Sequence, residues 1–194
     1  MKEVRNLFIP IIRMSLIILL LCGLLYPLVS TGIANVLMPE KAEGSLINNK
    51  KGEIIGSKLI GQNFTSPIFF HGRISSIGDN AASSGSTNYA PSNPNMIKRV
   101  KQSILDLKKQ NPSIQVNKIP IDLITNSGSG LDPDISLQAA LIQVNRISNE
   151  TGIDKIVLEK LVKKHIEGRQ LGIFGEEHVN VLKINLDLFK LMNK

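Results

Sequence analysis

A long uncharged apolar run near the N-terminus, residues 14–36, constrains this chain more than any other feature. Its sequence is MSLIILLLCGLLYPLVSTGIANV, in which about a dozen residues are Leu, Ile or Val. At roughly −0.5 kcal/mol each, these residues favour bilayer insertion by roughly 6 kcal/mol before the costs of Pro27 and Asn35. As a helix the run covers about 34 Å, which matches a hydrocarbon core of about 30 Å with some tilt. The run can therefore cross a membrane once.

A cleaved signal peptide is the alternative interpretation, because basic residues precede the run and it lies near the start of the chain. A signal h-region spans about 7–15 residues and ends at a small-x-small site. This run is longer and leads into Leu37-Met38-Pro39, so we favour a retained anchor at residues 12–36 after a stub at residues 1–11. The Leu residues before Cys22 argue against lipoprotein processing, and a single Cys forms no internal disulfide.

The charges that flank the anchor predict its orientation. The N-terminal flank carries Lys2, Glu3, Arg5 and Arg13. Because its basic residues are in excess, the positive-inside rule keeps this flank in the cytoplasm. The lysines beyond the anchor belong to a large domain, and such domains cross a membrane largely regardless of charge. We therefore expect residues 37–194 to form one extracytoplasmic domain.

The charge composition is that of a globular domain without a nucleic-acid surface. The 194 residues carry a net charge of +7, but the basic residues are scattered. Stacking on single strands needs interleaved aromatic residues, and the chain has no Trp and only two Tyr. We interpret the charges as solvated helix faces that also attract an anionic membrane.

The pattern of apolar runs and turn residues predicts an α/β or α+β fold in which helices cover one small sheet. Strands are expected at 46–47 and 53–55, joined by the turn 48–52, and Leu59-Ile60 is expected to continue this sheet. Two further strands are expected, one at an Ile-x-Val within 114–124 and one at 179–182. Three helices are expected to begin after the caps Asn93, Ser136 and Asp154 and to end near Asn111, Gly152 and Gly168. After a turn at 171–175, a short terminal helix covers 185–192.

Each of the three capped helices has an apolar stripe at helical spacing, which we expect to face the core. The first stripe is Met96, Ile97, Val100, Ile104 and Leu107. The second is Leu137, Ala140, Leu141, Val144 and Ile147. The third is Ile156, Val157, Leu161, Val162 and Ile166.

Two long polar stretches, residues 67–93 and 125–136, are poorly explained by folding needs alone. Both are rich in Ser, Gly, Asn, Asp and Pro, which indicates loops. A long loop inside a compact domain is usually functional or mobile, and loops on a rigid scaffold commonly carry recognition. We therefore expect these two loops to contact other molecules.

The motifs of a self-sufficient enzyme are absent from the sequence, which has no phosphate loop, phosphorylation loop, zinc motif or nucleophile elbow. His71 could act as a base with Ser83 or Ser127 as nucleophile. A membrane-anchored hydrolase or ligand-binding module using His71 is thus the alternative function. With three His and no recognisable acid partner, we favour a structural His71. For Arg73 we favour a contact within the loop over one with a partner's carboxylate.

The run Ser-Gly-Ser-Gly-Leu-Asp-Pro-Asp at 127–134 could cradle an anion with backbone N–H groups ahead of a helix. We favour a tight turn in which Asp132 and Ser136 cap that helix themselves. His165 and His178 are expected on the surface, beside lysines and glutamates respectively.

Nine short motifs follow one another in an order that covers nearly the whole chain. They are Gly-Ser-Leu-Ile (44–47), Gly-Ser-x-Leu-Ile-Gly-Gln-x-Phe (56–64), Phe-Phe-His-Gly-Arg (69–73), Ala-Ser-Ser-Gly-Ser-x-Asn (82–88), Ser-Asn-Pro (92–94), Ser-Gly-Ser-Gly-Leu-Asp-Pro-Asp-Ile-Ser (127–136), Gln-Ala-Ala (138–140), Gln-Val-x-Arg (143–146) and Val-Asn-Val-Leu-x-x-Asn (179–185). Together with the anchor, this set resembles the C subunit family of the Kdp potassium-transporting ATPase. The departures are Ile74 and Leu137, where the family usually has Pro, and Ser84, where it has Gly.

The resemblance implies a non-catalytic accessory subunit of a bacterial inner-membrane complex. Its partners would be a channel-like subunit that selects K⁺ and a P-type subunit that hydrolyses ATP. Family members are described as catalytic chaperones that raise the ATP affinity of the hydrolysing subunit through a transient complex with nucleotide. By position, the resemblance assigns nucleotide contact to Gln143, Ser127, Gly128, Ser129 and Gly130. No tightly bound cofactor is implied, and K⁺ is the transported ion.

Direct nucleotide contact conflicts with the predicted topology, because Gln143 would lie outside while ATP is inside. We favour the topology and hypothesise that the anchor docks on partner helices while both loops lie over the K⁺ entrance. The candidate contact residues are Gln62, His71, Arg73, Ser83, Gly85, Asn88, Asp132, Asp134 and Arg146. Asp79, Asp132 and Asp134 would raise the local K⁺ concentration by focusing the field. A purely structural role in assembly is the other alternative.

Overall fold

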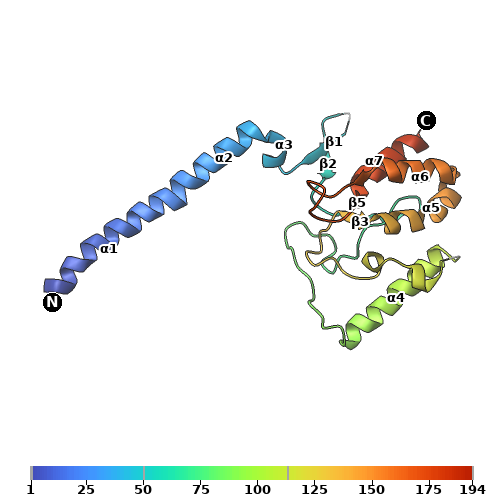
Figure 1. The fold of residues 1–194 in the computed structure, drawn as a ribbon, viewed down its shortest axis with the longest axis horizontal. Coiled ribbons are helices and arrows are strands. Elements are labelled where there is room, and N and C mark those ends of the chain that lie inside the picture. The colour runs from blue at the N-terminus through green and yellow to red at the C-terminus, as the bar shows by residue number, and fades with distance from the viewer. Residues whose placement is uncertain (1, 50, 113, 194) are drawn as a thin grey trace. The chain divides into compact units, whose positions relative to one another are not determined.

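The computed structural model describes residues 2–49, 51–112 and 114–193. Lys50 of the predicted turn and the side chains of Lys2 and Arg5 lie outside the described residues. The chain divides into two compact units, Met1–Leu46 and Ile47–Lys194 (Figure 1). Each unit is described by itself below.

The first unit is built on one long apolar helix. Its elements are α1 (Lys2–Leu20), a π-helical turn η1 (Leu21–Leu25), α2 (Tyr26–Leu37) and a short α3 (Pro39–Ala42). Phe8–Leu37, 30 residues long, has the length and composition of a membrane span, and the chain itself buries none of its most apolar window. This confirms the predicted N-terminal apolar helix and extends it toward the N-terminus. The free thiol of Cys22 is exposed on this helix.

Proline explains the π-helical turn inside the span. Pro27 has no N–H to donate to the carbonyl of Gly23, and its ring would crowd that carbonyl in a regular α-helix. Tyr26 N–H instead donates to the carbonyl of Leu21, five residues back. Such a widened turn is a common cause of a local irregularity in a long helix.

The second unit combines helices with two small sheets. A two-stranded sheet pairs β1 (Leu46–Asn48) with β2 (Ile54–Ser57). The other elements are α4 (Pro94–Gln110), the 3₁₀ turns η2 (Val116–Lys118) and η3 (Ile121–Leu123), β3 (Asp134–Ser136), α5 (Leu137–Thr151), α6 (Lys155–Lys164), β4 (Ile166–Glu167), β5 (His178–Asn180) and α7 (Val181–Met192). Strand β5 is central in an antiparallel sheet of order β3-β5-β4, with Val179 opposite both Ile135 and Ile166. This arrangement confirms the predicted fold class, with two small sheets where one was expected.

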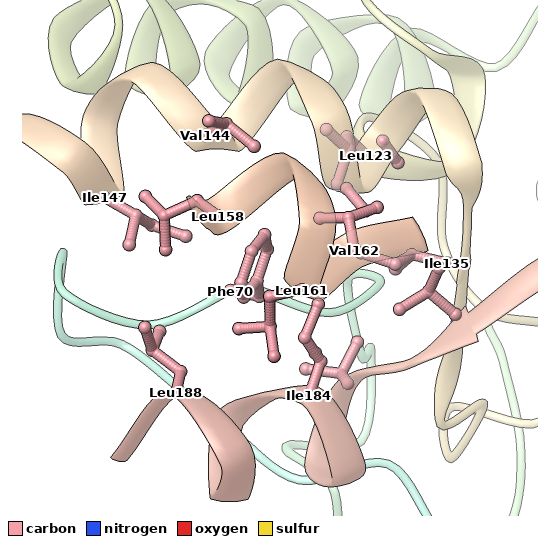
Figure 2. Packing of buried hydrophobic residues seen from close by; sticks show 14 residues of the cluster. Phe70, Leu123, Ile135, Val144, Ile147, Leu158, Leu161, Val162, Ile184 and Leu188 are labelled. Carbon is pink, nitrogen blue, oxygen red and sulfur yellow. The ribbon is translucent and has the colours of Figure 1, made fainter. Parts of the chain in front are cut away.

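One hydrophobic core lies among α5, α6, α7 and the three-stranded sheet. Figure 2 shows the ring of Phe70 surrounded by side chains from all three helices. These side chains include Val144 and Ile147 of α5, Leu158, Leu161 and Val162 of α6, and Ile184 and Leu188 of α7. Because Phe70 belongs to the long loop 67–93, the start of that loop is fixed by the core.

The predicted N-caps are confirmed, whereas α6 ends at Lys164 and not near Gly168, because Ile166 and Glu167 form β4. The side chains of Asn93, Ser136 and Asp154 each accept a hydrogen bond from a backbone N–H in the first turn of α4, α5 and α6. Gly152 ends α5 in the left-handed conformation, with φ of 73°, which favours glycine. Helix α4 stops before Asn111, as expected ahead of Pro112.

Several predicted strands are wrong. Leu59-Ile60 forms a turn, in which Leu59 N–H donates to Ser57 Oγ (3.1 Å). The segment 114–124 contains the two 3₁₀ turns in place of a strand. The predicted strand 179–182 ends at Asn180 because the Asn180 side chain caps α7, which therefore starts at residue 181 and not at 185. The sequence pattern missed β3 and β4, whose three and two residues are too short to show a period.

The inner faces of the helices also differ from the predicted stripes. The apolar residues Ile97 of α4, Leu141 of α5, and Ile156 and Val157 of α6 are exposed, although all four were expected to face the core. On α5, Gln143 and Arg146 are buried while Leu141 is exposed. The reason is that α5 faces a loop whose backbone needs hydrogen-bond partners, as described next.

Candidate functional site

Two buried amide side chains hold the backbone of the long loop where it leaves the core. Asn185 of α7 accepts from Phe70 N–H (2.8 Å) and donates to the Phe70 carbonyl (2.9 Å). Gln143 of α5 accepts from His71 N–H (2.8 Å) and donates to the His71 carbonyl (3.1 Å). Each amide thus satisfies both backbone groups of one residue, as a neighbouring strand would.

Arg146 completes this arrangement, which we call the loop clamp (Gln143, Arg146 and Asn185). Its guanidinium donates to the carbonyls of Pro67 and Phe69 and to Oε1 of Gln143, the last two at 3.0 and 2.7 Å. Arg146 is 4% exposed, and this burial lowers its pKa to about 10. It stays charged at neutral pH, so its attraction for the loop carbonyls is a charge-assisted one.

The contacts of His71 are those of a residue with a structural role. Its ring Nε2 donates to the carbonyl of Ser66 (3.0 Å). Burial and then the charge of Arg146 lower the pKa of His71, against the effect of the Ser66 hydrogen bond, so the ring is neutral at pH 7. In the described residues no hydrogen bond joins His71 to Ser83 or Ser127. These contacts support the structural interpretation of His71 over the hydrolase alternative.

The two polar loops pack on each other. Ile74 and Asn126 form a parallel β-bridge, and Ser127 N–H donates to the Ile74 carbonyl (3.0 Å). Further along, Gly85 N–H donates to the Ser129 carbonyl (2.8 Å). We call residues 67–93 and 125–136 together the loop pair. The clamp fixes one end of this pair, and backbone hydrogen bonds between the loops fix its middle.

Gly130 lies at a close contact between the two loops. Its φ is +71°, and a Cβ there would lie 2.6 Å from Ile77 Cγ1 and 2.8 Å from the Gly85 carbonyl oxygen. Both the backbone conformation and the space therefore require glycine. Gly128, two residues earlier, would meet nothing within 4 Å.

Arg73 connects the loops by its side chain. Its guanidinium contacts Asp132 Oδ2 at 2.8 Å and donates to the carbonyl of Asn126 at 3.0 Å. The contact expected within the loops is therefore present. The other oxygen of Asp132 accepts from Asp134 N–H (3.0 Å), so the prediction that Asp132 caps α5 is wrong. Ser136 performs that capping, accepting from Ala139 N–H at 3.1 Å.

The carboxylates proposed to attract K⁺ are not equivalent. Arg73 neutralises Asp132. Asp134 accepts from Asn180 Nδ2 (2.9 Å), and burial raises its pKa. Burial also raises the pKa of Asp79. A negative field at this surface would therefore come mainly from Asp79 and Asp134.

Three backbone amides at the end of the Ser-Gly-Ser-Gly run and just after it donate within the loop. Gly130 N–H donates to the Ser127 carbonyl (3.3 Å) and Leu131 N–H to Ser129 Oγ (3.1 Å). Asp132 N–H donates to Ser127 Oγ (3.3 Å). Because these donors are used inside the loop, the geometry supports a tight turn over an anion cradle.

The remaining candidates are Gln62, Ser83 and Asn88. Gln62 folds back onto β2, donating to the Ile55 carbonyl (3.3 Å). Ser83 and Asn88 are exposed on the first loop, Asn88 with φ of 47°. The described residues contain no group of His, Cys, Asp and Glu that could hold a metal ion. Four surface hollows of about 210 to 440 Å³ are lined by none of the candidate side chains.

The expectation that His165 is a surface residue is wrong. Its side chain is largely buried, and Nε2 lies 3.1 Å from Oδ2 of Asp187. His178 of β5 is partly exposed. Its Nε2 lies 3.8 Å from Oδ2 of Asp134 and 3.9 Å from Oε2 of Glu167. Helix α7 supplies Asp187 to α6, so tertiary packing and not the local lysines decides where His165 lies.

Comparison with known proteins identifies the family. A family described as "KdpC: K+-transporting ATPase, c chain" matches residues 8–190. The chain belongs to the KdpC family. It is 59% identical to the potassium-transporting ATPase KdpC subunit of Bacillus cereus (strain Q1), over 99% of this chain and 100% of the relative. The KdpC subunits of Bacillus thuringiensis subsp. konkukian and Bacillus mycoides (strain KBAB4) match at the same identity and coverage.

Membership in the KdpC family confirms the resemblance found in the sequence. The chain is a non-catalytic subunit of a potassium-transporting P-type ATPase with one N-terminal membrane helix. Other Kdp subunits are its implied partners. The roles of individual residues, the orientation in the membrane and any contact with ATP stay predictions.

Within this KdpC chain, sequence reasoning missed Asn185 as a clamp residue and assigned Gln143 and Arg146 to other roles. All three are polar residues that interrupt an apolar helix stripe, Asn185 directly after buried Ile184. That interruption was the available signal. The partners lie 72 and 115 residues away in the sequence, so no local pattern could name them.

Proposed function

We propose that this chain supports potassium uptake as an accessory subunit that presents the loop pair as a preorganised docking surface for other Kdp subunits. The observation that carries the proposal is the loop clamp, which fixes a long polar loop to the hydrophobic core. A loop held in its bound conformation loses little entropy on docking. The relatives are named as subunits of a potassium-transporting ATPase, which supports a role in potassium transport.

We place the loop pair outside the cytoplasm, over the K⁺ entrance, on the basis of the charges flanking the anchor. Asp79 and Asp134 would contribute the negative field there, since Arg73 already neutralises Asp132. Carboxylates of this kind raise a local cation concentration without forming a tight site.

An effect on ATP affinity would pass through protein contacts in this proposal. The four hydrogen bonds of Gln143, to both backbone groups of His71, to Arg146 and to the carbonyl of Ala139, occupy both ends of its amide. Contact with nucleotide through Gln143 would need the clamp to open and leave buried backbone groups unpaired. We therefore propose that the chain acts on the hydrolysing subunit without holding ATP through this residue.

Bulky substitution at the exposed loop tests the docking role. Ser83→Trp places a large side chain on the loop pair without disturbing a buried contact, and Asn149→Trp does the same on the exposed side of α5. With the complete complex, we expect Ser83→Trp to raise the K⁺ concentration for half-maximal ATPase activity at least fivefold. Asn149→Trp should leave it unchanged. Equal values for both variants and the parent would contradict the proposal.

Photolabelling of the complete complex with an azido derivative of ATP tests the proposed route to the hydrolysing subunit. We expect label on the hydrolysing subunit and none above background on this chain. Label mapped to residues 127–143 of this chain would show that nucleotide reaches the clamp and would overturn the proposed route.

A further inference from the structure

Three bulky apolar side chains stand in solvent at the hairpin tip between β4 and β5. Leu171, Ile173 and Phe174 have exposed fractions of 89%, 72% and 63%. Single exposed apolar residues are ordinary in soluble domains, but three such residues in one turn form a patch that folding leaves uncovered. We call these three residues the apolar tip.

The backbone of the tip is closed on itself. Gln170 N–H donates to the Phe174 carbonyl (2.8 Å), and Phe174 N–H donates to the Gln170 carbonyl (2.9 Å). Gly172 N–H and Ile173 N–H donate to the carbonyls of Arg169 and Gln170, each at 3.1 Å. Because these four donors are satisfied inside the hairpin, the tip can leave water without stranding them.

Leu171 has a backbone conformation that its side chain disfavours. Its φ is +53°, and Gly172 follows at +73°. This left-handed region suits Gly, Asn and Asp, whereas other L-residues adopt it at a steric cost. Neither packing nor turn chemistry therefore explains a leucine here. Strained residues of this kind cluster where a protein contacts a ligand or partner.

The charges at the base of the hairpin indicate what covers the tip. Glu167 is paired with Lys183, and Glu176 with Arg169. No ion pair among the described residues neutralises Glu177, so the local excess is negative although the whole chain carries +7. An anionic bilayer would repel this base. A protein surface with lysine or arginine would attract it.

We propose that the apolar tip inserts into an apolar pocket, bordered by lysine or arginine, on another subunit of the Kdp complex. The inference rests on the accessory role proposed above and adds a second contact made by residues outside the loop pair. Burying three large apolar side chains in one pocket is favourable because it removes their apolar surface from water. The closed backbone keeps the entropic cost of docking low.

Site-specific crosslinking in native membranes identifies the occupant. Benzoylphenylalanine replaces Phe174 in the full chain, expressed with the rest of the complex, and the matched control replaces Phe189, an exposed phenylalanine of α7 (54%). We expect Phe174 to crosslink to another Kdp subunit with at least tenfold higher yield than Phe189. Crosslinks to lipid or to a second copy of this chain, or equal yields at both positions, would overturn the proposal.

Binding of purified full-length chain to complexes isolated without it measures the contribution of the tip. Leu171→Gly removes the side chain and the backbone strain together, so the free chain should unfold at the same or a higher temperature. We expect Leu171→Gly to raise the Kd about tenfold, equivalent to about 1.4 kcal/mol. Glu177→Lys should weaken binding more at low salt than at high salt. Phe189→Ala is the control that should bind like the parent.

The outcomes separate this inference from the proposed function. A Kd for Leu171→Gly within twofold of the parent would overturn the role of the tip. If Ser83→Trp still raises the K⁺ requirement in that case, the docking role of the loop pair stands alone. If neither substitution has an effect, both proposals fail.

Discussion

The membrane helix and helix α5 show opposite relations between polarity and burial. Phe8–Leu37 is mostly apolar, with Arg13 and Asn35 as exceptions, yet the chain buries none of its most apolar window. Helix α5 buries Gln143 and Arg146 while Leu141 on the same helix is exposed. The difference shows that whether a side chain is buried depends on what lies beside it, and not on its polarity alone. Lipid is the partner that suits the first helix, and the backbone of a polar loop is the partner that α5 binds.

Replacing Gln143 with leucine should lower the stability of the chain more than any other change discussed here. The substitution makes α5 more apolar, but it leaves the groups that Gln143 binds without hydrogen-bond partners. The partly buried N–H and carbonyl of His71 would lose their hydrogen bonds, and buried Arg146 would lose one of its acceptors. We expect a loss of about 4 kcal/mol in the free energy of unfolding, since each stranded buried group costs about 1–3 kcal/mol. Urea unfolding of the full chain in detergent measures it. Asn145→Leu, on the exposed side of α5, should change stability by less than about 0.5 kcal/mol; equal stabilities would refute the clamp.

The converse change, Leu24→Lys, places a charge in the apolar helix. Leu24 is exposed in the middle of the span, and a lysine at the centre of a membrane helix costs about 3 kcal/mol on the insertion scale. We expect a clearly smaller membrane fraction after carbonate extraction. Leu24→Ala is the control and should remain in the membrane. Full retention of the Leu24→Lys chain would mean that this helix does not face lipid.

Gly130→Ala tests how far the rigidity of the clamp extends into the loop pair. The added methyl group meets Ile77 and the Gly85 carbonyl, and φ is +71°. We expect a loss of about 2 kcal/mol, the usual cost of an L-residue in this conformation. Gly128→Ala, where the methyl group meets nothing within 4 Å, should be nearly neutral. Thermal unfolding of both variants checks this, and indistinguishable midpoints would show that the loops are not packed as described.

The smallest effect is the pH dependence that His71 contributes. Burial lowers its pKa in the folded chain below the ordinary value of 6.5, so the unfolded chain binds the proton more readily. Stability should therefore fall as the pH is lowered below about 6.5. Comparing unfolding midpoints at pH 7.5 and 5.5, we expect His71→Gln to lose part of the decrease seen in the parent. A larger decrease in the variant would contradict a neutral, buried His71.

Local chemistry made the helices and their caps predictable from the sequence, whereas the clamp depends on contacts distant in sequence. Asn93, Ser136 and Asp154 act on N–H groups two or three residues away, so the sequence shows the whole interaction. Gln143 and Asn185 act on His71 and Phe70, 72 and 115 residues distant.

The predicted stripe of α5 was right at Ala140, Val144 and Ile147 but wrong at Leu141, for the same reason. It assumed that only apolar residues turn inward, while the loop backbone required polar ones. Most of both stretches is loop, as the sequence predicts, and a contact of Arg73 within the loops was expected before Asp132 was known as its partner. The functional role of the loops stays a prediction. Their mutual packing through Ile74 and Ser127 has no counterpart in the local pattern.

Hydrogen exchange of the full-length chain in detergent tests the central claim most directly, namely that the clamp fixes a polar loop as firmly as a core element. We predict that the amides of Phe70 and His71 exchange as slowly as those in the middle of α5, while exposed residues near Ser83 exchange quickly. In Gln143→Leu the protection of His71 should be lost selectively. Fast exchange of Phe70 and His71 in the parent chain would contradict the account.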